Sequence, residues 1–229
     1  MTKPRPIRTA TERSIEVPRT ARYYEMGDAV GGDLWVVLHG FGQLAGDFVE
    51  YFAELNDGSR VIVAPEALNR YYTASLSVPS AERPVGATWM TREFREAEMS
   101  DYVRYLDLLH LELTNRFRPR RTIVVGFSQG GATASRWVVK GNSAIHTLVL
   151  WGATLPPDLE LSGARDRLAA TRLKLVIGNT DQYISPEATI RERERLENAN
   201  VPAEFIEYEA GHVIKRGVLK ELAARIAGS

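Results

Sequence analysis

Short apolar runs alternate with stretches of helical periodicity along most of the chain. The runs are rich in Val, Ile and Leu with few polar positions, which is typical of strands buried on both faces of a parallel sheet. A last run alternates apolar and polar residues, as a half-buried strand does. We therefore predict strands at residues 33–38, 60–65, 122–125, 146–151, 173–177 and 205–208.

Between these strands, apolar side chains recur every three or four residues, which indicates amphipathic helices. The longest pattern runs over residues 91–117 and places Met99, Leu106 and Phe117 on one face. Further helices are predicted within residues 48–55, 132–139, 187–198 and 218–226, and residues 156–171 are expected to be partly helical. The alternation predicts an α/β fold with a mostly parallel central sheet flanked by helices.

The N-terminal residues do not follow this pattern. Residues 1–13 contain prolines and arginines without periodicity, and we predict a flexible lead-in. Residues 14–18 and 21–26 are predicted to form two short edge strands joined as a hairpin, because Pro18 is tolerated only at the edge of a sheet. Residues 14–229 are interpreted as one domain, since no sequence remains for a second one.

Composition narrows the classes of function. Of the 229 residues 44% are hydrophobic, and Lys plus Arg equals Asp plus Glu at 29 each, so no net charge favours nucleic acid or an anionic membrane. The absence of cysteine excludes disulfides and a thiol nucleophile. Neither a signal peptide nor an apolar stretch of roughly 18 residues is recognisable. We expect a soluble cytoplasmic protein without stable membrane insertion; a homodimer is left open.

The most informative stretch is the strand at residues 122–125 running into Gly126-Phe127-Ser128-Gln129-Gly130. A buried strand that passes into a helix through Gly-x-Ser-x-Gly is the nucleophile elbow, a strained turn that exposes the serine oxygen at the carboxyl end of the strand. The glycines are required because a Cβ at either position would clash with neighbouring backbone. The pattern predicts Ser128 as a nucleophile.

Two residues further along can activate that serine. Asp181 follows the strand at residues 173–177, and His212 follows the strand at residues 205–208. The order Ser, Asp, His is the one in which α/β-hydrolases supply nucleophile, acid and base. A neutral imidazole takes the proton of the serine as it attacks, and a carboxylate fixes the imidazole tautomer. Asp158 and Asp166 are alternatives to Asp181, although neither directly follows a strand.

A tetrahedral oxyanion needs two preorganised donors. The backbone amide of Gln129 directly follows the nucleophile, and the amide of Phe41 lies in the loop His39-Gly40-Phe41-Gly42 after another predicted strand. His39 is expected to brace this loop rather than transfer protons. These parts describe transfer of an acyl group to water through an acyl-serine intermediate, which requires no metal or organic cofactor.

The connection at residues 66–87 is long, aromatic and proline-bearing. A connection of this length within a compact domain is usually a binding or lid loop. We predict that it forms one wall of the substrate pocket and that Tyr71 contacts the substrate. The alternative is a disordered surface excursion.

His39-Gly-Phe-Gly, Gly126-Phe-Ser-Gln-Gly-Gly, Gly178-x-x-Asp181 and Gly211-His212-x-Ile214 resemble the four blocks of the phospholipase/carboxylesterase family, across roughly residues 33–227. The resemblance implies an α/β-hydrolase without a large cap domain, with Ser128, Asp181 and His212 as triad, and acyl esters or thioesters as substrates. The chain departs from the family at Gln43, where many members carry aspartate, and between residues 71 and 91. Trp89 and Trp151 are candidates for lining the acyl pocket.

The resulting hypothesis is a serine carboxylesterase acting on short- to medium-chain acyl esters, with a small-molecule ester as its partner. A lysophospholipase or acyl thioesterase would use the same groups and differ only in the pocket. A small-molecule receptor that retains the triad but turns over slowly is the alternative outside enzymes. The sequence does not identify the acyl and alcohol parts of the substrate or its stereochemistry.

Overall fold

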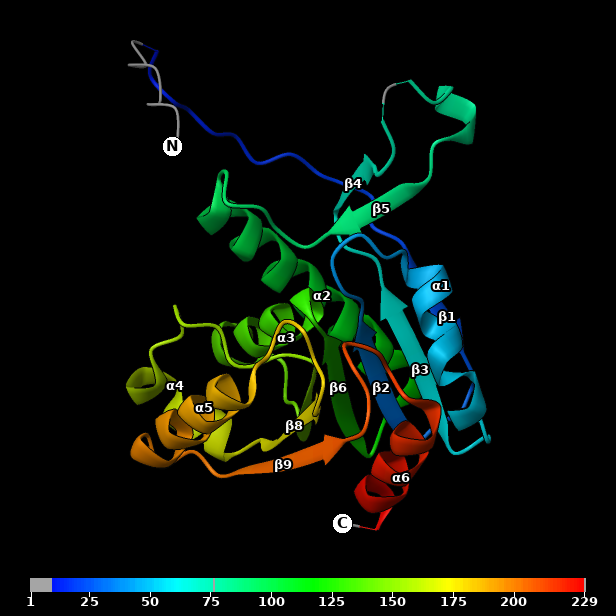
Figure 1. Cartoon of the computed structure of the whole chain (residues 1–229). Coiled ribbons are helices and arrows are strands. Elements are labelled where there is room, and N and C mark those ends of the chain that lie inside the picture. The colour runs from blue at the N-terminus through cyan, green and yellow to red at the C-terminus, as the bar shows by residue number, and fades with distance from the viewer. Residues whose placement is uncertain (1–9, 76, 229) are drawn as a thin grey trace.

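Strands and helices alternate in the computed structural model, which describes residues 10–75 and 77–228 (Figure 1). Within these residues seven strands form one sheet in the order β1-β3-β2-β6-β7-β8-β9. Strand β1 is antiparallel to β3, and all other neighbours are parallel, which confirms the predicted architecture. The strands are β1 (Tyr23–Met26), β2 (Asp33–Leu38), β3 (Arg60–Pro65), β6 (Arg121–Phe127), β7 (Thr147–Trp151), β8 (Arg172–Gly178) and β9 (Ala203–Tyr208).

Helices cover both faces of the sheet (Figure 1). One face carries α1 (Ala45–Val49), the 3₁₀ helix η1 (Glu50–Leu55) and α6 (Arg216–Ala227). The other carries α2 (Arg95–Phe117), α3 (Gln129–Lys140), α4 (Leu161–Ala169) and α5 (Pro186–Asn198). Helix α2 begins four residues later than predicted, because Phe94 has a left-handed φ of 50° and Thr91 and Glu93 hydrogen-bond to each other instead of entering the helix.

The core lies in two layers, one on each side of the sheet. Along β2, Val36 and Leu38 pack in the layer that includes α2 and α3, whereas Trp35 and Val37 pack in the layer that includes α1 and α6. This separation follows from the two-residue period of a strand. Both layers are apolar, which explains why the parallel strands show continuous apolar runs rather than alternation.

The N-terminal hairpin predicted at residues 14–18 and 21–26 is wrong. Only β1 forms, and it pairs with β3, whereas residues 14–18 have no regular secondary structure and are exposed. In this segment Glu16 forms an ion pair with Arg104 of α2. Of the lead-in predicted at residues 1–13, residues 1–9 lie outside the described part of the chain, as does residue 229.

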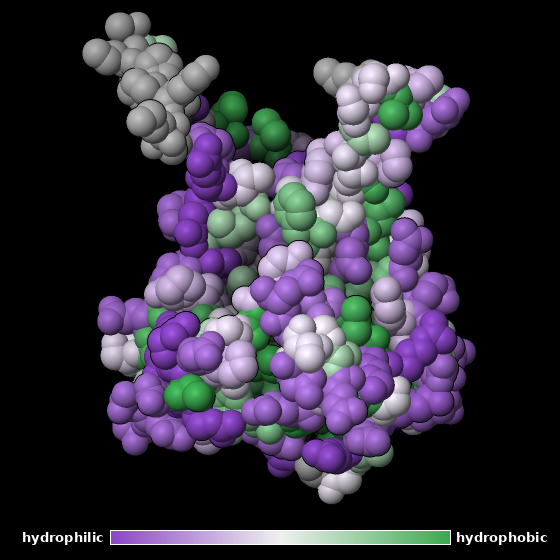
Figure 2. Space-filling view, in the orientation of Figure 1, coloured by the Kyte–Doolittle hydropathy of each residue, from purple (hydrophilic) through white to green (hydrophobic). Residues whose placement is uncertain are grey.

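The long connection after β3 contains a two-stranded antiparallel arm, formed by β4 (Asn69–Tyr72) and β5 (Val85–Thr88), with a 3₁₀ turn η2 (Ser80–Glu82) toward its tip. The arm projects from the carboxyl end of the sheet, above a face that carries mostly hydrophilic residues (Figures 1 and 2). Across the described residues this arm is the main insertion, and no large cap domain covers the sheet. The same residues contain no helix that is both long and apolar enough to cross a bilayer.

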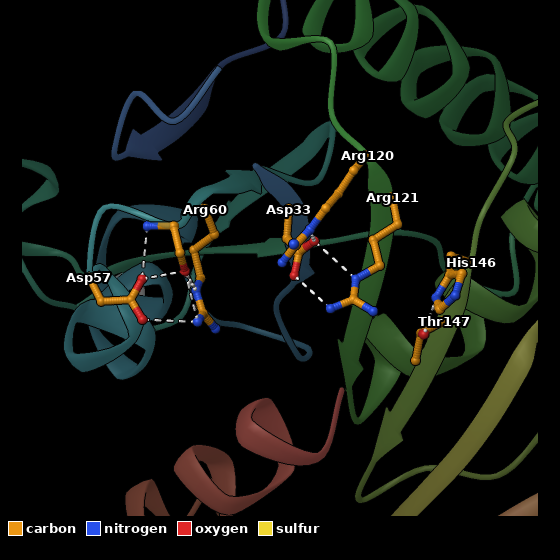
Figure 3. Close-up of polar contacts among 8 residues, drawn as sticks. Asp33, Asp57, Arg60, Arg120, Arg121, His146 and Thr147 are labelled. Carbon is orange, nitrogen blue, oxygen red and sulfur yellow. Dashed lines mark hydrogen bonds and ion pairs between the residues drawn. The ribbon is translucent and has the colours of Figure 1, made fainter. Parts of the chain in front are cut away.

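Charged side chains gather at the opposite, amino end of the sheet (Figure 3). Asp33, the first residue of β2, accepts hydrogen bonds from Arg120 Nε at 2.7 Å and from Arg121 Nε at 2.9 Å. Beside it, Arg60 at the start of β3 is bound by Asp57 at 3.0 Å. At this end of the sheet, Asp33 and Arg60 are therefore both paired with oppositely charged side chains of the same chain.

Candidate active site

Ser128 lies in the turn between β6 and α3 with φ 52° and ψ −118°, a conformation that costs energy for any residue with a side chain. A Cβ on Gly126 would lie 2.4 Å from the carbonyl oxygen of Gly130, and a Cβ on Gly130 would lie 2.2 Å from that of Leu38. The expected clash is confirmed at both glycines, although at Gly130 it comes from β2. The strand and helix are therefore close enough to force this turn.

His212 and Asp181 are brought together from the loops after β9 and β8. His212 Nδ1 lies 2.7 Å from Asp181 Oδ2, and Asp181 Oδ1 accepts the backbone N–H of Tyr183 at 2.8 Å and of Ile184 at 3.2 Å. Because the carboxylate is buried and accepts on both oxygens, it is held as a fixed acceptor for the imidazole. The hydrogen bond places the proton of the neutral imidazole on Nδ1.

The alternative acids lie elsewhere. Asp158 is bound by Arg136 and Arg95, and hydrogen bonding from Arg136 holds its pKa well below the usual range. Asp166 lies exposed on α4. Neither carboxylate contacts His212, so the geometry favours Asp181.

The imidazole of His212 contacts two aromatic rings, with its centroid 4.9 Å from that of Phe127 and 4.6 Å from that of Tyr183. Its Nε2 is buried and has no hydrogen-bond partner among the described residues. Gly152 allows this position, because a Cβ there would lie 2.9 Å from His212 Cε1. The adjacent Trp151 carbonyl accepts the N–H of Ser128 at 2.9 Å, which brings the serine and the imidazole to the same end of the sheet. No hydrogen bond joins Ser128 Oγ to Nε2, a looseness common before substrate binds.

Trp151 holds the histidine loop instead of lining a pocket. Its side chain is 0% exposed, and its Nε1 donates to Tyr208 Oη at 2.8 Å and to the Val213 carbonyl at 3.0 Å. Tyr208 Oη donates to the same carbonyl at 2.5 Å. The expectation that Trp151 contacts the acyl group is therefore corrected, because the indole offers no surface to a substrate.

The loop after β2 presents free amides beside the serine. A Cβ on Gly40 would lie 3.3 Å from Ser128 Cβ, so the loop passes directly over the nucleophile. Gln43 closes it by accepting the Gly40 N–H at 2.8 Å through its side chain. Within the described residues, the backbone N–H groups of Phe41 and Gln129 have no acceptor. These are the two amides that the sequence indicates for an oxyanion.

His39 braces this loop, as expected. Its Nδ1 donates to the Gly40 carbonyl at 2.8 Å, and its Nε2 accepts the N–H of Ala67 at 3.1 Å. Burial lowers the pKa of His39, which keeps the imidazole neutral and compatible with both hydrogen bonds. Both ring nitrogens are thereby occupied, so His39 has none available for proton transfer.

The base of the β4–β5 arm joins the loop to the elbow. The carbonyl of Ala87 accepts the N–H of Gly42 at 2.8 Å, and the Ala87 N–H donates to the Gln43 carbonyl at 3.3 Å. The side chain of Gln129 accepts the N–H of Trp89 at 3.1 Å and donates to the carbonyl of Met90 at 2.9 Å. This role of the side chain is not visible in the sequence, because the contact joins segments 40 residues apart.

Trp89 is also a core residue. It is 1% exposed, and its Nε1 donates to the His39 carbonyl at 2.9 Å. Like Trp151, it offers no surface to an acyl group, and the expectation that it lines the pocket is corrected. Both indoles fix loops that carry the site.

Several aromatic and apolar side chains lie on the loops that carry the site. Phe41 is 60% exposed and its ring lies 5.5 Å from that of Tyr71, which is half-buried at the base of the arm. Tyr183 is 71% exposed and Val213 is 51% exposed, and both adjoin His212. Tyr183 was not predicted as a site residue. The sequence feature that could have indicated it is its position, an aromatic residue two places after Asp181. No group of three or more acidic, histidine or cysteine side chains in the described chain could hold a metal ion.

Comparison with known proteins identifies the family and the fold. Residues 33–227 match the family model described as Phospholipase/Carboxylesterase. No curated protein matches the sequence. Among solved structures, Zea mays acyl-protein thioesterase 2 shares 18% identity with a TM-score of 0.68, covering 91% of this chain and 99% of its own.

A Bacillus cereus carboxylesterase shares 17% identity with a TM-score of 0.64, covering 89% of this chain and 92% of its own. The esterase PE8 shares 19% identity with a TM-score of 0.64, covering 91% and 98% of the two chains. At these identities the solved structures establish a common fold, whereas the family model spans most of the chain and contains all the residues that form the site. The chain therefore belongs to the phospholipase/carboxylesterase family and is a hydrolase of that type.

Proposed function

We propose that the protein is a serine carboxylesterase that hydrolyses short- to medium-chain acyl esters through an acyl-serine intermediate. The observation that carries the proposal is the imidazole of His212, which is fixed by Asp181 through Nδ1 and leaves a buried Nε2 without a partner at the end of the sheet where Ser128 lies. Leaving a buried nitrogen unpaired costs free energy, and a catalytic role is one reason for a protein to keep such a group. Its function here is to take the proton of Ser128.

In acylation, Ser128 Oγ attacks the ester carbonyl while its proton passes to His212 Nε2. The amides of Phe41 and Gln129 stabilise the oxyanion that forms. The bond to the alcohol then breaks, and Nε2 returns the proton to the departing alcohol oxygen. The acyl group remains on Ser128.

In deacylation, water replaces the alcohol. His212 Nε2 takes a proton from the water as its oxygen attacks the acyl-serine, and the same two amides stabilise the second oxyanion. The Ser128–acyl bond breaks, the proton returns to Oγ and the carboxylic acid leaves. Throughout, Asp181 stabilises the imidazolium without becoming protonated.

The test is the initial rate of hydrolysis of p-nitrophenyl esters from acetate to palmitate by the wild type and by Ser128→Ala. We expect the variant to lose at least about 10³-fold in kcat at every chain length the wild type accepts. Ser135→Ala is the matched control, because Ser135 lies buried in α3, the helix that follows Ser128, and donates to the Gly131 carbonyl. Wild-type turnover by Ser128→Ala would contradict the mechanism.

A thioester is the second candidate substrate. One solved structure with this fold is titled an acyl-protein thioesterase, and the same groups would cleave a thioester by the same steps. A lysophospholipid would likewise require only a different pocket. Rates on an acyl-CoA, a lysophospholipid and a simple ester of equal acyl length, at equal concentration, distinguish the three.

A further inference from the structure

The side chain of Tyr183 contacts the imidazole of His212, the candidate base. Its ring meets that of His212 in an edge arrangement, with centroids 4.6 Å apart and an interplanar angle of 69°. Its backbone N–H donates to Asp181 Oδ1, which fixes the start of the side chain, whereas the side chain itself is 71% exposed. A large aromatic surface is therefore held against the imidazole and open to solvent.

The chemistry of acylation determines which part of the substrate comes to this surface. The group that protonates the departing alcohol is His212 Nε2, so the alcohol oxygen must come within hydrogen-bond distance of it, about 3 Å. The acyl carbon is bonded to Ser128, and the oxyanion points to the amides of Phe41 and Gln129. The alcohol part of the ester consequently lies on the His212 side of the serine.

The two rings that pack against His212 differ in exposure. The ring of Phe127 is buried, whereas that of Tyr183 is exposed. Asp181 adds no charge here, because its side chain is buried and its oxygens are occupied by His212 and two backbone N–H groups. Tyr183 therefore offers the substrate an aromatic, uncharged surface next to the imidazole.

We propose that Tyr183 forms a leaving-group subsite that favours esters of neutral, flat aryl alcohols over esters of alkyl alcohols. The proposal rests on the proposed function and specifies the substrate class for the same site. An aryl ring placed against Tyr183 gains an offset or edge contact, which an alkyl chain of similar size does not. Tyr183 thereby determines specificity without taking part in proton transfer.

The test compares two acetates whose alcohols have similar acidity, phenyl acetate and a fluoroalkyl acetate, so that leaving-group chemistry is matched. In Tyr183→Ala we expect the ratio of kcat/KM for phenyl acetate to that for the fluoroalkyl acetate to fall about fivefold, the size of one aromatic contact. Tyr183→Phe keeps the ring and should keep the wild-type ratio. Tyr24→Ala, at an exposed tyrosine of β1 on the edge of the sheet, should also leave it unchanged.

Deacylation separates a subsite from a support for His212. Both acetates give the same acetyl-enzyme after the alcohol has left, so a leaving-group subsite predicts an unchanged deacylation rate in Tyr183→Ala, measured after a pre-steady-state burst. If Tyr183 serves only to hold the imidazole, the variant will slow both acetates equally and slow deacylation as well. That outcome, or an unchanged kcat/KM ratio, overturns the subsite.

Ser128→Ala on the same two acetates keeps the two proposals apart. Serine-independent turnover would contradict the proposed function itself. Serine-dependent turnover with the same ratio in the wild type and in Tyr183→Ala would contradict only the subsite.

Discussion

The two ends of the parallel sheet use the same kinds of residue in opposite ways. At the amino end, Asp33 is saturated by Arg120 and Arg121, and Arg60 by Asp57. At the carboxyl end, the Asp181–His212 pair leaves Nε2 unpaired, and the amides of Phe41 and Gln129 lack acceptors within the described chain. Polar groups that are all hydrogen-bonded within the protein stabilise the fold. Polar groups left without a partner can instead bind the transition state. The carboxylates at the two ends should therefore respond differently to the same substitution.

The largest difference is expected from Asp181→Asn. The amide retains the size of the carboxylate but donates as well as accepts, so it favours the wrong imidazole tautomer, and we expect kcat to fall about 10⁴-fold. Ester turnover and the urea midpoint should be measured on the same preparation. A loss of activity explained by unfolding alone would remove Asp181 from the mechanism.

The matched substitution at the other end, Asp33→Asn, should act on stability. Removing the charge weakens the contact with Arg121, whose guanidinium is largely buried, and we expect a loss of about 3 kcal/mol in the free energy of unfolding. Arg120 is more exposed and contributes less. Denaturant titration measures the loss, while kcat per folded molecule should stay at the wild-type value. A large fall in kcat would contradict the idea that the amino end of the sheet contributes to stability alone.

A smaller effect on kcat is expected from the side chain of Gln129, which supports the fold and at the same time positions a catalytic loop. Gln129→Ala keeps the backbone amide but releases Trp89 and Met90, which hold the base of the arm and, through Ala87, the loop that carries Phe41. We expect kcat to fall about tenfold through displacement of one oxyanion donor. Single-turnover kinetics with p-nitrophenyl acetate would show this as slower acylation. Unchanged acylation would mean that the loop holds its position without the arm.

The smallest effect is a separation of two pH ranges. Burial would raise the pKa of Asp33, but hydrogen bonds from Arg120 and Arg121 outweigh it and hold the pKa below its ordinary value. A carboxylate whose pKa is depressed on folding stabilises the protein above its unfolded pKa, and this stabilisation is lost as pH falls through the folded pKa. Activity has an acid limit of its own, because a protonated imidazole cannot act as base.

The measurement is ester turnover and circular dichroism at each pH between 8 and about 2, with Asp33→Asn as control. That variant should lose part of the acid dependence of its stability while keeping the wild-type profile of activity. Coincident loss of activity and structure would show that unfolding, rather than protonation of the base, limits the enzyme in acid.

Much of the fold follows from local patterns. The parallel strands have continuous apolar runs because both of their faces are covered, and the elbow is visible because Gly126 and Gly130 face backbone at distances that admit no Cβ. The hairpin expected from residues 14–18 and 21–26 did not form, although β1 is the edge strand of the sheet among the described residues. Residues 14–18 are exposed and bury no apolar face that would hold a second strand there, and Glu16 instead pairs with Arg104 of α2.

The candidate site was partly predictable. Ser128, Asp181 and His212 follow strands, and the carboxyl ends of parallel strands meet at one edge of a sheet, so chain order alone indicates their proximity. The tryptophans were misassigned because an indole beside a site has the same sequence signature whether it faces a ligand or the core. Burial decides between the two, and burial depends on residues far apart in the chain.

The sequence by itself thus determined the sheet, the elbow and the residues that carry reactive groups, because strand periodicity and glycine sterics act over a few neighbouring positions. Only the tertiary structure decided which polar groups are hydrogen-bonded and which are left without a partner. It placed Trp151 under the histidine loop, Gln129 against the arm and Tyr183 against His212. Each of these contacts joins separate segments of chain, and its geometry is set by how the sheet, the arm and the loops pack together.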